Sequence, residues 1–284
     1  MYQEFIVPGR DIEVKGYHFG VENPNHVVVV VHGIGEHAGR YKRVASYFNE
    51  KGVALIAMDL RGHGKTPGVR GDASTRNDIF GDIDALIEYA KSTYPGVPVI
   101  VYGHSMGGGI VSDYRARGNM NGTVQGFIIS APWLLLVNSF PDAAVKAIGA
   151  VSKLLPKLKI SSACDENDLG NPEFVRPYKD DPLVHPYITL RTAYQCFSIG
   201  KAIAEGTNEK NENEGKVPTL LMHGSLDKIC DVNGSRKLAE LNKDNPLFTY
   251  VEWEGYYHEI HNGGPNGETG EEPINRALEF ILGI

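Results

Sequence analysis

The sequence has little of what several large classes of protein require. Its three cysteines are an odd number without Cys-x-x-Cys spacing, which argues against a disulfide framework and against a zinc site. It contains no run of about 18 apolar residues, so we expect no membrane-spanning helix. It has no long run of Lys or Arg and its net charge is −7, which argues against a nucleic-acid partner.

Two further signals are missing. The first residues show no basic segment followed by an apolar stretch, so we expect no secretory signal. No glycine-rich loop leads into Lys-Ser or Lys-Thr, so nucleotide binding is not indicated. Unpaired thiols suit a reducing compartment. We therefore predict a cytoplasmic protein that works without a cofactor or a metal, and nothing in the sequence indicates its oligomeric state.

What the chain does have is a regular alternation of apolar runs and amphipathic stretches. The five consecutive valines at 27–31 lack polar alternation, which is typical of a strand buried on both faces of a sheet. Strands that alternate with helices predict an α/β protein whose largely parallel sheet is covered on both faces. We expect the main buried strands at residues 27–31, 53–58, 97–102, 124–129, 217–222 and 248–252.

One long segment interrupts this alternation. Residues 132–215 contain several helical stretches and polar loops but no buried strand. The interruption falls between two strands of the predicted sheet, at the edge where open α/β sheets bind their ligands. We therefore predict a core made of residues 1–131 and 216–284, with residues 132–215 inserted as a helical cap.

The pentapeptide Gly103-His104-Ser105-Met106-Gly107 is the strongest catalytic signal in the chain. It follows a strand-like run and precedes a helix-like stretch, which is the context of a Gly-x-Ser-x-Gly nucleophile elbow. Glycine is expected on both sides of the serine because a side chain there would crowd the strained bend. The bend presents the hydroxyl at a helix N-terminus, where developing negative charge is stabilised. We predict that Ser105 is a nucleophile.

A serine nucleophile needs a histidine base and an acid that orients the imidazole, in the chain order Ser, acid, His. Asp227 follows a late strand in a Gly-Ser turn and is our candidate acid. Asp231 competes with it, but Asp231 is also well placed to cap a helix that starts near residue 232. His258 follows the last strand and is our candidate base, with His261 as its rival.

An oxyanion hole needs two backbone N–H groups that point at one position. The first is expected from Met106, directly after the nucleophile. The second is expected from the loop His32-Gly33-Ile34-Gly35, which follows an early buried strand, with Ile34 as the donor. Asp59, Arg61 and His63 also cluster in the sequence, and we interpret them as a sharp turn with a buried Asp–Arg pair rather than a metal site.

With these residues placed, the chain resembles the monoacylglycerol lipase branch of the α/β-hydrolase superfamily. The resemblance implies a mostly parallel eight-stranded sheet flanked by helices, with an inserted helical cap. It implies a serine carboxylic ester hydrolase that cleaves monoacylglycerols to fatty acid and glycerol through an acyl-enzyme. It extends over nearly the whole chain and is carried by residues 32–41 (HGIGEHAGRY), 59–64 (DLRGHG), 103–108 (GHSMGG), 224–227 (GSLD) with Cys230-Asp231, and Tyr257-His258 with His261.

The resemblance also implies a polar site for the glycerol headgroup, formed by Glu36, Arg40 and His261 with Tyr178 as a fourth member. Glu36 and Arg40 are four residues apart, a spacing that suits an ion pair on a helical turn. Such a pair either holds substrate hydroxyls through charge-assisted hydrogen bonds or fixes the loop. His261 is either a ligand of the diol or a solvated loop histidine. Cys230 follows the acid closely, and the mechanism does not require it.

The predicted cap carries an apolar stripe at helical spacing, interleaved with lysines. This pattern allows contact with a membrane or a lipid aggregate, and it equally allows a helix that simply packs on the core. The cap also departs most from the family, around residues 186–189 and 208–214. Alternative functions are a lysophospholipase or a short-chain or aryl carboxylesterase and, more remotely, a non-catalytic ligand-binding protein on the same fold.

Overall fold

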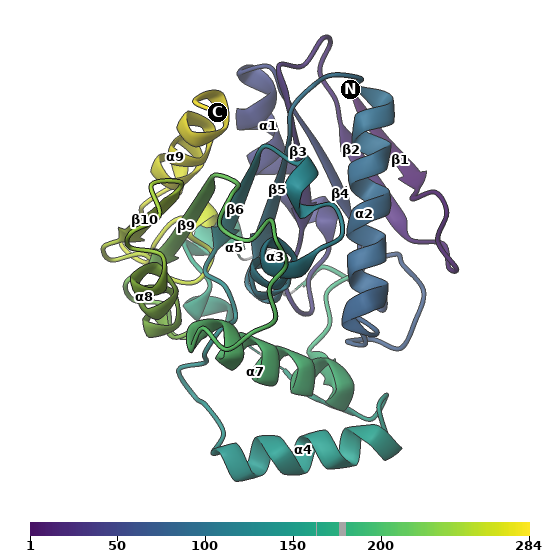
Figure 1. The fold of residues 1–284 in the computed structure, drawn as a ribbon, viewed down its shortest axis with the longest axis vertical. Helices are drawn as coiled ribbons and strands as arrows, with labels where there is room; N and C mark the ends of the chain where they lie inside the picture. The colour runs from purple at the N-terminus through teal and green to yellow at the C-terminus, as the bar shows by residue number, and fades with distance from the viewer. Residues whose placement is uncertain (163, 176–179) are drawn as a thin grey trace.

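A computed structural model describes residues 1–162, 164–175 and 180–284 of the protein. At its centre lies an eight-stranded sheet with the strand order β1-β2-β4-β3-β5-β6-β9-β10 (Figure 1). The strands are β1 (Tyr2–Ile6), β2 (Lys15–Phe19), β3 (His26–Val31), β4 (Val53–Met58), β5 (Val99–His104), β6 (Gly126–Ser130), β9 (Thr219–Gly224) and β10 (Phe248–Trp253).

The sheet is parallel except at β2, which pairs antiparallel with both of its neighbours. The valine run forms β3, where Val29 lies opposite Ile56 of β4 on one side and Val101 of β5 on the other. Every residue of these three strands is buried, as expected for strands covered on both faces. The predicted mostly parallel, eight-stranded sheet is confirmed.

Helices cover both faces of the sheet. On one face, α1 (Lys42–Glu50) and α9 (Glu271–Leu282) contribute to a core with Phe48 and Ile281. On the other face, α2 (Arg76–Thr93), α3 (Met106–Arg117) and α8 (Val232–Leu241) contribute to a second core. The start of α2 is fixed by a capping box in which the side chains of Thr75 and Asp78 each accept from the other's backbone N–H.

The segment between β6 and β9 forms α4 (Asp142–Leu154), α5 (Pro172–Val175), α7 (Leu190–Ala204) and the short antiparallel pair β7 (Lys159–Ser161) and β8 (Tyr187–Thr189). Helix α7 packs against α3 and α8, and α4 packs on α7. In Figure 1, α4 lies at the lower end of the molecule, beyond α7 and away from the sheet. The division into a core and a cap stays a prediction, and this layered arrangement is consistent with it.

Short 3₁₀ turns connect several of these elements: Ala38–Tyr41, Asn121–Thr123, Glu166–Asp168 and Ile260–Asn262. Cys164, Cys196 and Cys230 are free thiols. Among the described residues, no helix combines the length and the apolar character that crossing a bilayer would require.

Candidate active site

Ser105 lies in the bend between β5 and α3, with φ 57° and ψ −120°. This is a left-handed conformation that residues with a side chain rarely adopt. The glycines on either side are required by close backbone contacts. A methyl group on Gly107 would overlap the carbonyl oxygen of Val31, and one on Gly103 would overlap that of Gly107. The strand–turn–helix geometry expected of a nucleophile elbow is therefore present.

The structure brings Ser105, His258 and Asp227 together. The Oγ of Ser105 lies 2.8 Å from Nε2 of His258, and Nδ1 of His258 lies 2.7 Å from Oδ2 of Asp227. All three side chains are buried, although they are far apart in the sequence. The rival acid, Asp231, accepts a hydrogen bond from the N–H of Asn233 and caps α8, as its alternative interpretation expected.

Four donors surround the carboxylate of Asp227. Oδ1 accepts from the backbone N–H groups of Ile229 (2.8 Å) and Cys230 (3.0 Å). Oδ2 faces Nδ1 of His258 and also Nε2 of His223, at 3.0 Å. Burial alone would raise the pKa of Asp227, but the two imidazoles hold it well below its usual range. Burial alone would lower the pKa of His258, and the Asp227 carboxylate outweighs burial and raises it.

The loop after β3 lies directly against the nucleophile. A Cβ on Gly33 would lie 2.9 Å from Oε1 of Glu36 and 3.0 Å from Cβ of Ser105, so a larger residue here would have to displace its neighbours. The N–H of Gly33 donates to Oε1 of Glu36 at 2.6 Å, which fixes the loop. Ile34 lines the same cavity as Ser105, and Met106 opens α3, where a helix has N–H groups without intrahelical acceptors. These positions suit the two N–H donors predicted for an oxyanion hole.

The Glu36–Arg40 ion pair expected from the spacing is present, with Nη1 of Arg40 2.7 Å from Oε2 of Glu36. The sequence did not lead us to its third member, Glu259. Arg40 forms a bidentate pair with Glu259, at 2.8 and 2.9 Å, and all three side chains line the cavity. Burial and the neighbouring Glu259 raise the pKa of Glu36 against the opposing pull of Arg40, whereas Arg40 holds the pKa of Glu259 below its usual range despite burial.

His261 does not line this cavity. It lies in the 3₁₀ turn Ile260–Asn262, buried and stacked on the ring of Tyr41, with the two centroids 5.6 Å apart. Its Nδ1 has no partner among the described residues, and burial lowers its pKa to about 4. It is therefore not the solvated loop histidine of the alternative interpretation. Tyr178, the other predicted headgroup residue, lies outside the described residues.

The expected Asp59–Arg61 pair is wrong. Arg61 pairs with Asp82 at 2.7 Å and with Asp11 at 2.5 Å. Asp59 instead accepts from the hydroxyl of Tyr17 and from the backbone N–H groups of Ala38 and Lys65. The two residues are close in the sequence, but tertiary contacts supply each of them with a different set of partners.

Asp227, Cys230 and His258 offer ligand atoms within 4.8 Å of one another, as a metal site would require. Asp227 and His258 are already hydrogen-bonded to each other, and Asp227 has two backbone donors besides. Burial raises the pKa of the Cys230 thiol well above its usual range, which disfavours the thiolate that a metal needs. The group fits an acid–base pair better than a metal site.

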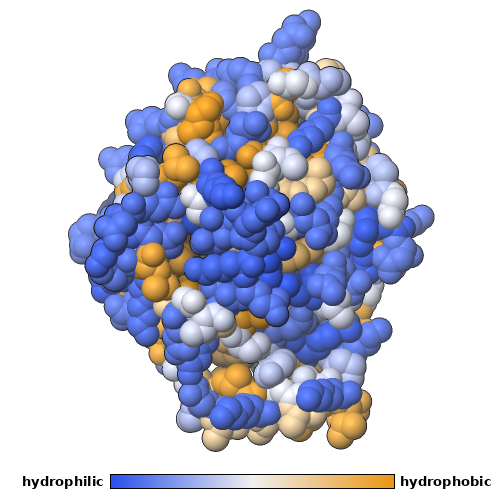
Figure 2. All heavy atoms as spheres, viewed as in Figure 1, coloured by the Kyte–Doolittle hydropathy of each residue, from blue (hydrophilic) through white to orange (hydrophobic). Residues whose placement is uncertain are grey.

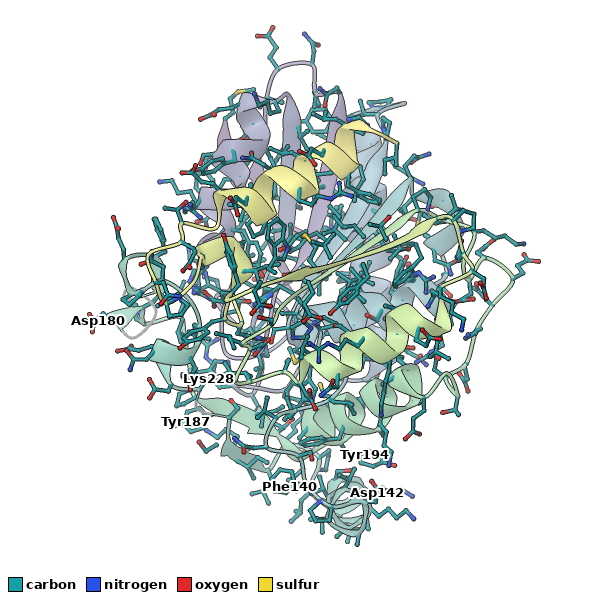
Figure 3. All side chains as sticks on the ribbon, turned by 90° about the vertical axis from the view of Figure 1, so that its left-hand side faces the viewer. Phe140, Asp142, Asp180, Tyr187, Tyr194 and Lys228 are labelled. Atoms are coloured by element: carbon teal, nitrogen blue, oxygen red, sulfur yellow. The ribbon has the colours of Figure 1, made fainter. Side chains whose placement is uncertain are left out.

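A cavity of about 410 Å³ opens over Ser105 and His258. Such a volume is within the range of small-ligand sites. The charged cluster of Glu36, Arg40 and Glu259 lines one part of it. Its apolar lining comes from both the core and the segment between β6 and β9, through Ile34, Trp133, Leu136, Phe140, Ile160, Leu169, Ile188, Phe197 and Ile229. Figure 3 shows Phe140 near α4, with Tyr187 and Lys228 toward the sheet.

The chain is similar to known hydrolases. A family model described as Hydrolase_4, serine aminopeptidase S33, matches residues 22–264. A monoacylglycerol lipase of Mycolicibacterium smegmatis is 32% identical over 241 residues, which are 84% of this chain and 83% of that protein. A phospholipase of Bacillus subtilis is 30% identical over 249 residues, or 85% of this chain and 90% of that protein.

A solved structure is also similar over almost its full length. The crystal structure of Paleococcus ferrophilus monoacylglycerol lipase superimposes with a TM-score of 0.81 at 32% sequence identity. The alignment covers 96% of this chain and 99% of that one. The likeness therefore includes both the sheet and most of the segment between β6 and β9.

Proposed function

This chain belongs to the α/β-hydrolase family of serine hydrolases that includes the monoacylglycerol lipases, and from that premise we propose that it cleaves monoacylglycerols to fatty acid and glycerol. It is a carboxylic ester hydrolase. One observation carries the substrate proposal. Ser105 and His258 line the same cavity as a largely apolar wall and a compact charged cluster. An acyl chain suits the apolar wall, and a small polyol suits the cluster.

In the proposed reaction, Ser105 attacks the ester carbonyl while Nε2 of His258 accepts its proton. The carboxylate of Asp227 stabilises the imidazolium that forms. The N–H groups of Ile34 and Met106 stabilise the oxyanion of the tetrahedral intermediate. His258 then protonates the leaving glycerol oxygen, and in the second half-reaction it takes a proton from the water that releases the fatty acid.

We assign the leaving-group side of the cavity to Glu36, Arg40 and Glu259. From the sequence, this ion pair either holds substrate hydroxyls or fixes the loop. Glu36 accepts from the N–H of Gly33 and also pairs with Arg40 at the cavity wall, so the same pair can do both. His261 supports this region from behind, through Tyr41, rather than by contact with the cavity. The polar atoms of the cluster are bound mainly to one another, which suits neutral hydroxyls better than a charged group.

The similarity to a phospholipase makes a lysophospholipase the second candidate. An anionic phosphate would need a cation that is not already neutralised. Among the described residues, Arg40 and Lys228 are the basic side chains that line the cavity. Arg40 binds two carboxylates, and Lys228 lies 2.8 Å from Asp168. The charge balance therefore favours a neutral headgroup.

An aminopeptidase, as in the description of the family model, would need an anion that anchors the substrate ammonium group. Glu36 and Glu259 lie close to the nucleophile, but both are already paired with Arg40. The four carboxylate oxygens of Glu36 and Glu259 already accept hydrogen bonds from Arg40, Gly33, Tyr41 and Asn262. They therefore offer few acceptor sites to an ammonium group, which favours ester cleavage over peptide cleavage.

We also propose that residues 132–215 form a cap that contacts lipid surfaces. Helix α4 buries only Gly149 and Ser152, and Leu154 at its end is 83% exposed. Figure 2 shows hydrophobic side chains at the lower end of the molecule, where Figure 1 places α4. Apolar residues flanked by lysines are typical of a helix that lies on an anionic membrane. The exposed apolar residues are Val137, Phe140, Val151, Leu154, Leu155 and Leu158.

Hydrolysis of a substrate panel tests the proposed activity. We expect the highest kcat/KM with long-chain monoacylglycerols, lower values with diacylglycerols and short esters, and the lowest with lysophospholipids. Ser105→Ala should abolish turnover and labelling by a fluorophosphonate. Ser112→Ala is the control, since Ser112 lies in α3, the helix that Ser105 precedes, and this variant should keep both. A preference for lysophospholipids would contradict the substrate proposal, and an active Ser105→Ala variant would contradict the triad.

Co-sedimentation with vesicles tests the cap. Leu154→Ser should weaken binding to anionic vesicles, because Leu154 is the most exposed large apolar side chain of α4. Leu282→Ser is the matched control, since Leu282 is an exposed leucine at the end of α9, on the opposite side of the molecule in Figure 1. Equal vesicle binding by both variants would contradict a docking role for α4.

A further inference from the structure

His223 shares the carboxylate oxygen that orients the proposed general base. It is the fifth residue of β9 and is fully buried. Its Nε2 lies 3.0 Å from Oδ2 of Asp227, the same oxygen that Nδ1 of His258 approaches to 2.7 Å. One carboxylate oxygen thus lies between two imidazole rings, and the triad expected from the sequence has a fourth member.

The neighbours of His223 determine which of its ring nitrogens carries a proton. Nε2 faces Oδ2 of Asp227 and, at 3.2 Å, the carbonyl oxygen of Cys230. Both are acceptors, so Nε2 must be the donor. Nδ1 lies 2.7 Å from the hydroxyl of Ser235, which is buried on α8. The Ser235 hydroxyl can donate to Nδ1, and this completes the bonding of a neutral ring.

We propose that His223 is a positioning residue of this hydrolase, which holds Oδ2 of Asp227 in line with His258 and withdraws negative charge from that oxygen. The proposal rests on the proposed function only in so far as Ser105, His258 and Asp227 carry the reaction. His223 does not touch the substrate and transfers no proton. It acts on the reaction through Asp227 alone, with Ser235 fixing its orientation.

The physical effect follows from the two donors on one oxygen. When His258 accepts the proton of Ser105, Asp227 must stabilise the imidazolium without taking the proton from it. A second N–H on Oδ2 spreads the carboxylate charge and makes Asp227 a weaker base. The low pKa of Asp227, to which the hydrogen bond from His223 contributes, is consistent with this effect. Loss of the His223 donor should therefore make Asp227 more basic and raise the pKa of His258.

Other groups also influence His258, and the test must leave them unchanged. Cys230 comes from the loop after β9, His104 from β5, Glu36 from the loop after β3, and Glu259 and His261 from the loop of His258 itself. Among the hydrogen bonds described above, the side chain of His223 contacts only Asp227, the carbonyl of Cys230 and Ser235. A conservative change at residue 223 therefore alters the Asp227 oxygen selectively.

Two amide substitutions of different length, His223→Gln and His223→Asn, distinguish the roles of the two ring nitrogens. In His223→Gln, the amide nitrogen can occupy the place of Nε2 and can donate to both acceptors. In His223→Asn, the shorter side chain reaches only the place of Nδ1, near Ser235, and leaves Oδ2 of Asp227 with His258 alone. The two variants are both polar and neutral, so they differ chiefly in the donor to Asp227.

The kinetics of a soluble ester, p-nitrophenyl butyrate, provide the test. For His223→Asn we expect kcat to fall at least about 10-fold, as when a metal-bound histidine loses the group that orients it, with little change in KM. The acid limb of kcat/KM should move to higher pH by roughly half a unit. His223→Gln should restore most of kcat and the original limb. His18→Asn is the matched control. His18 lies on β2, and the change removes a buried imidazole that is hydrogen-bonded to Tyr94. It should change neither kcat nor the acid limb of kcat/KM.

Equal losses in His223→Asn and His223→Gln with an unshifted acid limb would mean a merely structural role and would overturn the proposal. So would wild-type kinetics in His223→Asn. Should His223→Asn not fold, ¹⁵N NMR of the wild-type protein decides: we expect His223 to stay in the Nε2–H tautomer when Ser105 is phosphonylated. An Nδ1–H tautomer would exclude donation to Asp227. An inactive Ser105→Ala variant beside an unaffected His223→Asn variant would overturn this inference alone, leaving the proposed function intact.

Discussion

Removal of the Arg40 side chain provides the sharpest test of the charged cluster beside the nucleophile. In Arg40→Met, Glu36 and Glu259 lose the cation that they share, while both stay almost fully buried. Methionine keeps much of the volume of the arginine stem, so the change removes charge more than it removes packing. We expect the folded state to lose more than an exposed salt bridge would contribute.

The expected magnitude follows from the burial. An exposed ion pair is worth up to about 1 kcal/mol, whereas removal of one partner of a buried pair costs about 3–5 kcal/mol. Side-chain exposure is 12% for Arg40, 4% for Glu36 and 3% for Glu259, so the buried case applies. The free energy of unfolding should fall by roughly 3–5 kcal/mol near neutral pH, which is a large part of the total for a typical domain.

The loss should depend on pH in a defined direction. In the wild-type protein Arg40 lowers the pKa of Glu259, so this pair stabilises the fold above the unfolded pKa of glutamate and less as the pH falls through it. In Arg40→Met, burial without a cation raises both carboxyl pKa values, so the variant loses stability as the pH rises through them. The loss in free energy of unfolding caused by Arg40→Met should therefore be larger at about pH 8 than at about pH 5.

Urea unfolding at these two pH values is the assay. Arg43→Met is the matched control, because Arg43 donates to the backbone carbonyls of His261 and Thr269 and, among the described residues, forms no ion pair with a buried carboxylate. Its effect should be smaller and nearly independent of pH. A loss below about 1 kcal/mol in Arg40→Met, or one of equal size at both pH values, would refute the reasoning, because it would mean that the cluster behaves as a solvated surface pair.

Three further outcomes are expected. Asp227→Asn should lower kcat about 10⁴-fold with a small change in KM, measured with p-nitrophenyl butyrate, because the amide stabilises the wrong tautomer of the base; retention of a tenth of the activity would argue against Asp227. Because the pKa of His258 is raised above the ordinary histidine value of about 6.5, the acid limb of kcat/KM should lie above that ordinary value. An acid limb below about 6.5 would contradict the raised pKa. Gly107→Ala should prevent stable folding, since the methyl group meets the Val31 carbonyl, whereas Gly96→Ala has open space and should cost only about 1 kcal/mol in thermal unfolding for its left-handed φ.

Much of the site could be predicted because it lies at the ends of strands. The elbow, the acid loop and the histidine loop each follow an apolar run, and parallel strands end at one edge of the sheet. The order of these segments along the chain and the chemistry of acyl transfer therefore sufficed to favour Ser105, Asp227 and His258 before any contact was known. The choice of Asp227 over Asp231 also had a local basis, because Asp231 stands where a helix cap is expected.

Other members depend on contacts that the sequence pattern does not show. Glu259 acquires its role from Arg40, 219 residues earlier, and His223 acquires its role from the way the β9 strand and the following loop place Asp227. Neither has a signal in its own neighbourhood beyond being a charged or titratable residue beside a predicted catalytic one. The pairing of Arg61 with Asp82 instead of Asp59 was missed for the same reason.

The sequence by itself determined the fold class, the nucleophile elbow and the order of the triad, because these depend on local periodicity and on residues that tight turns require. Only the tertiary structure decided how the charges are balanced around them. In the folded protein Arg40 pairs with two carboxylates, and His261 stacks on Tyr41 outside the cavity. Burial and charge pairing are properties of the assembled fold, since they arise only when distant segments exclude water together.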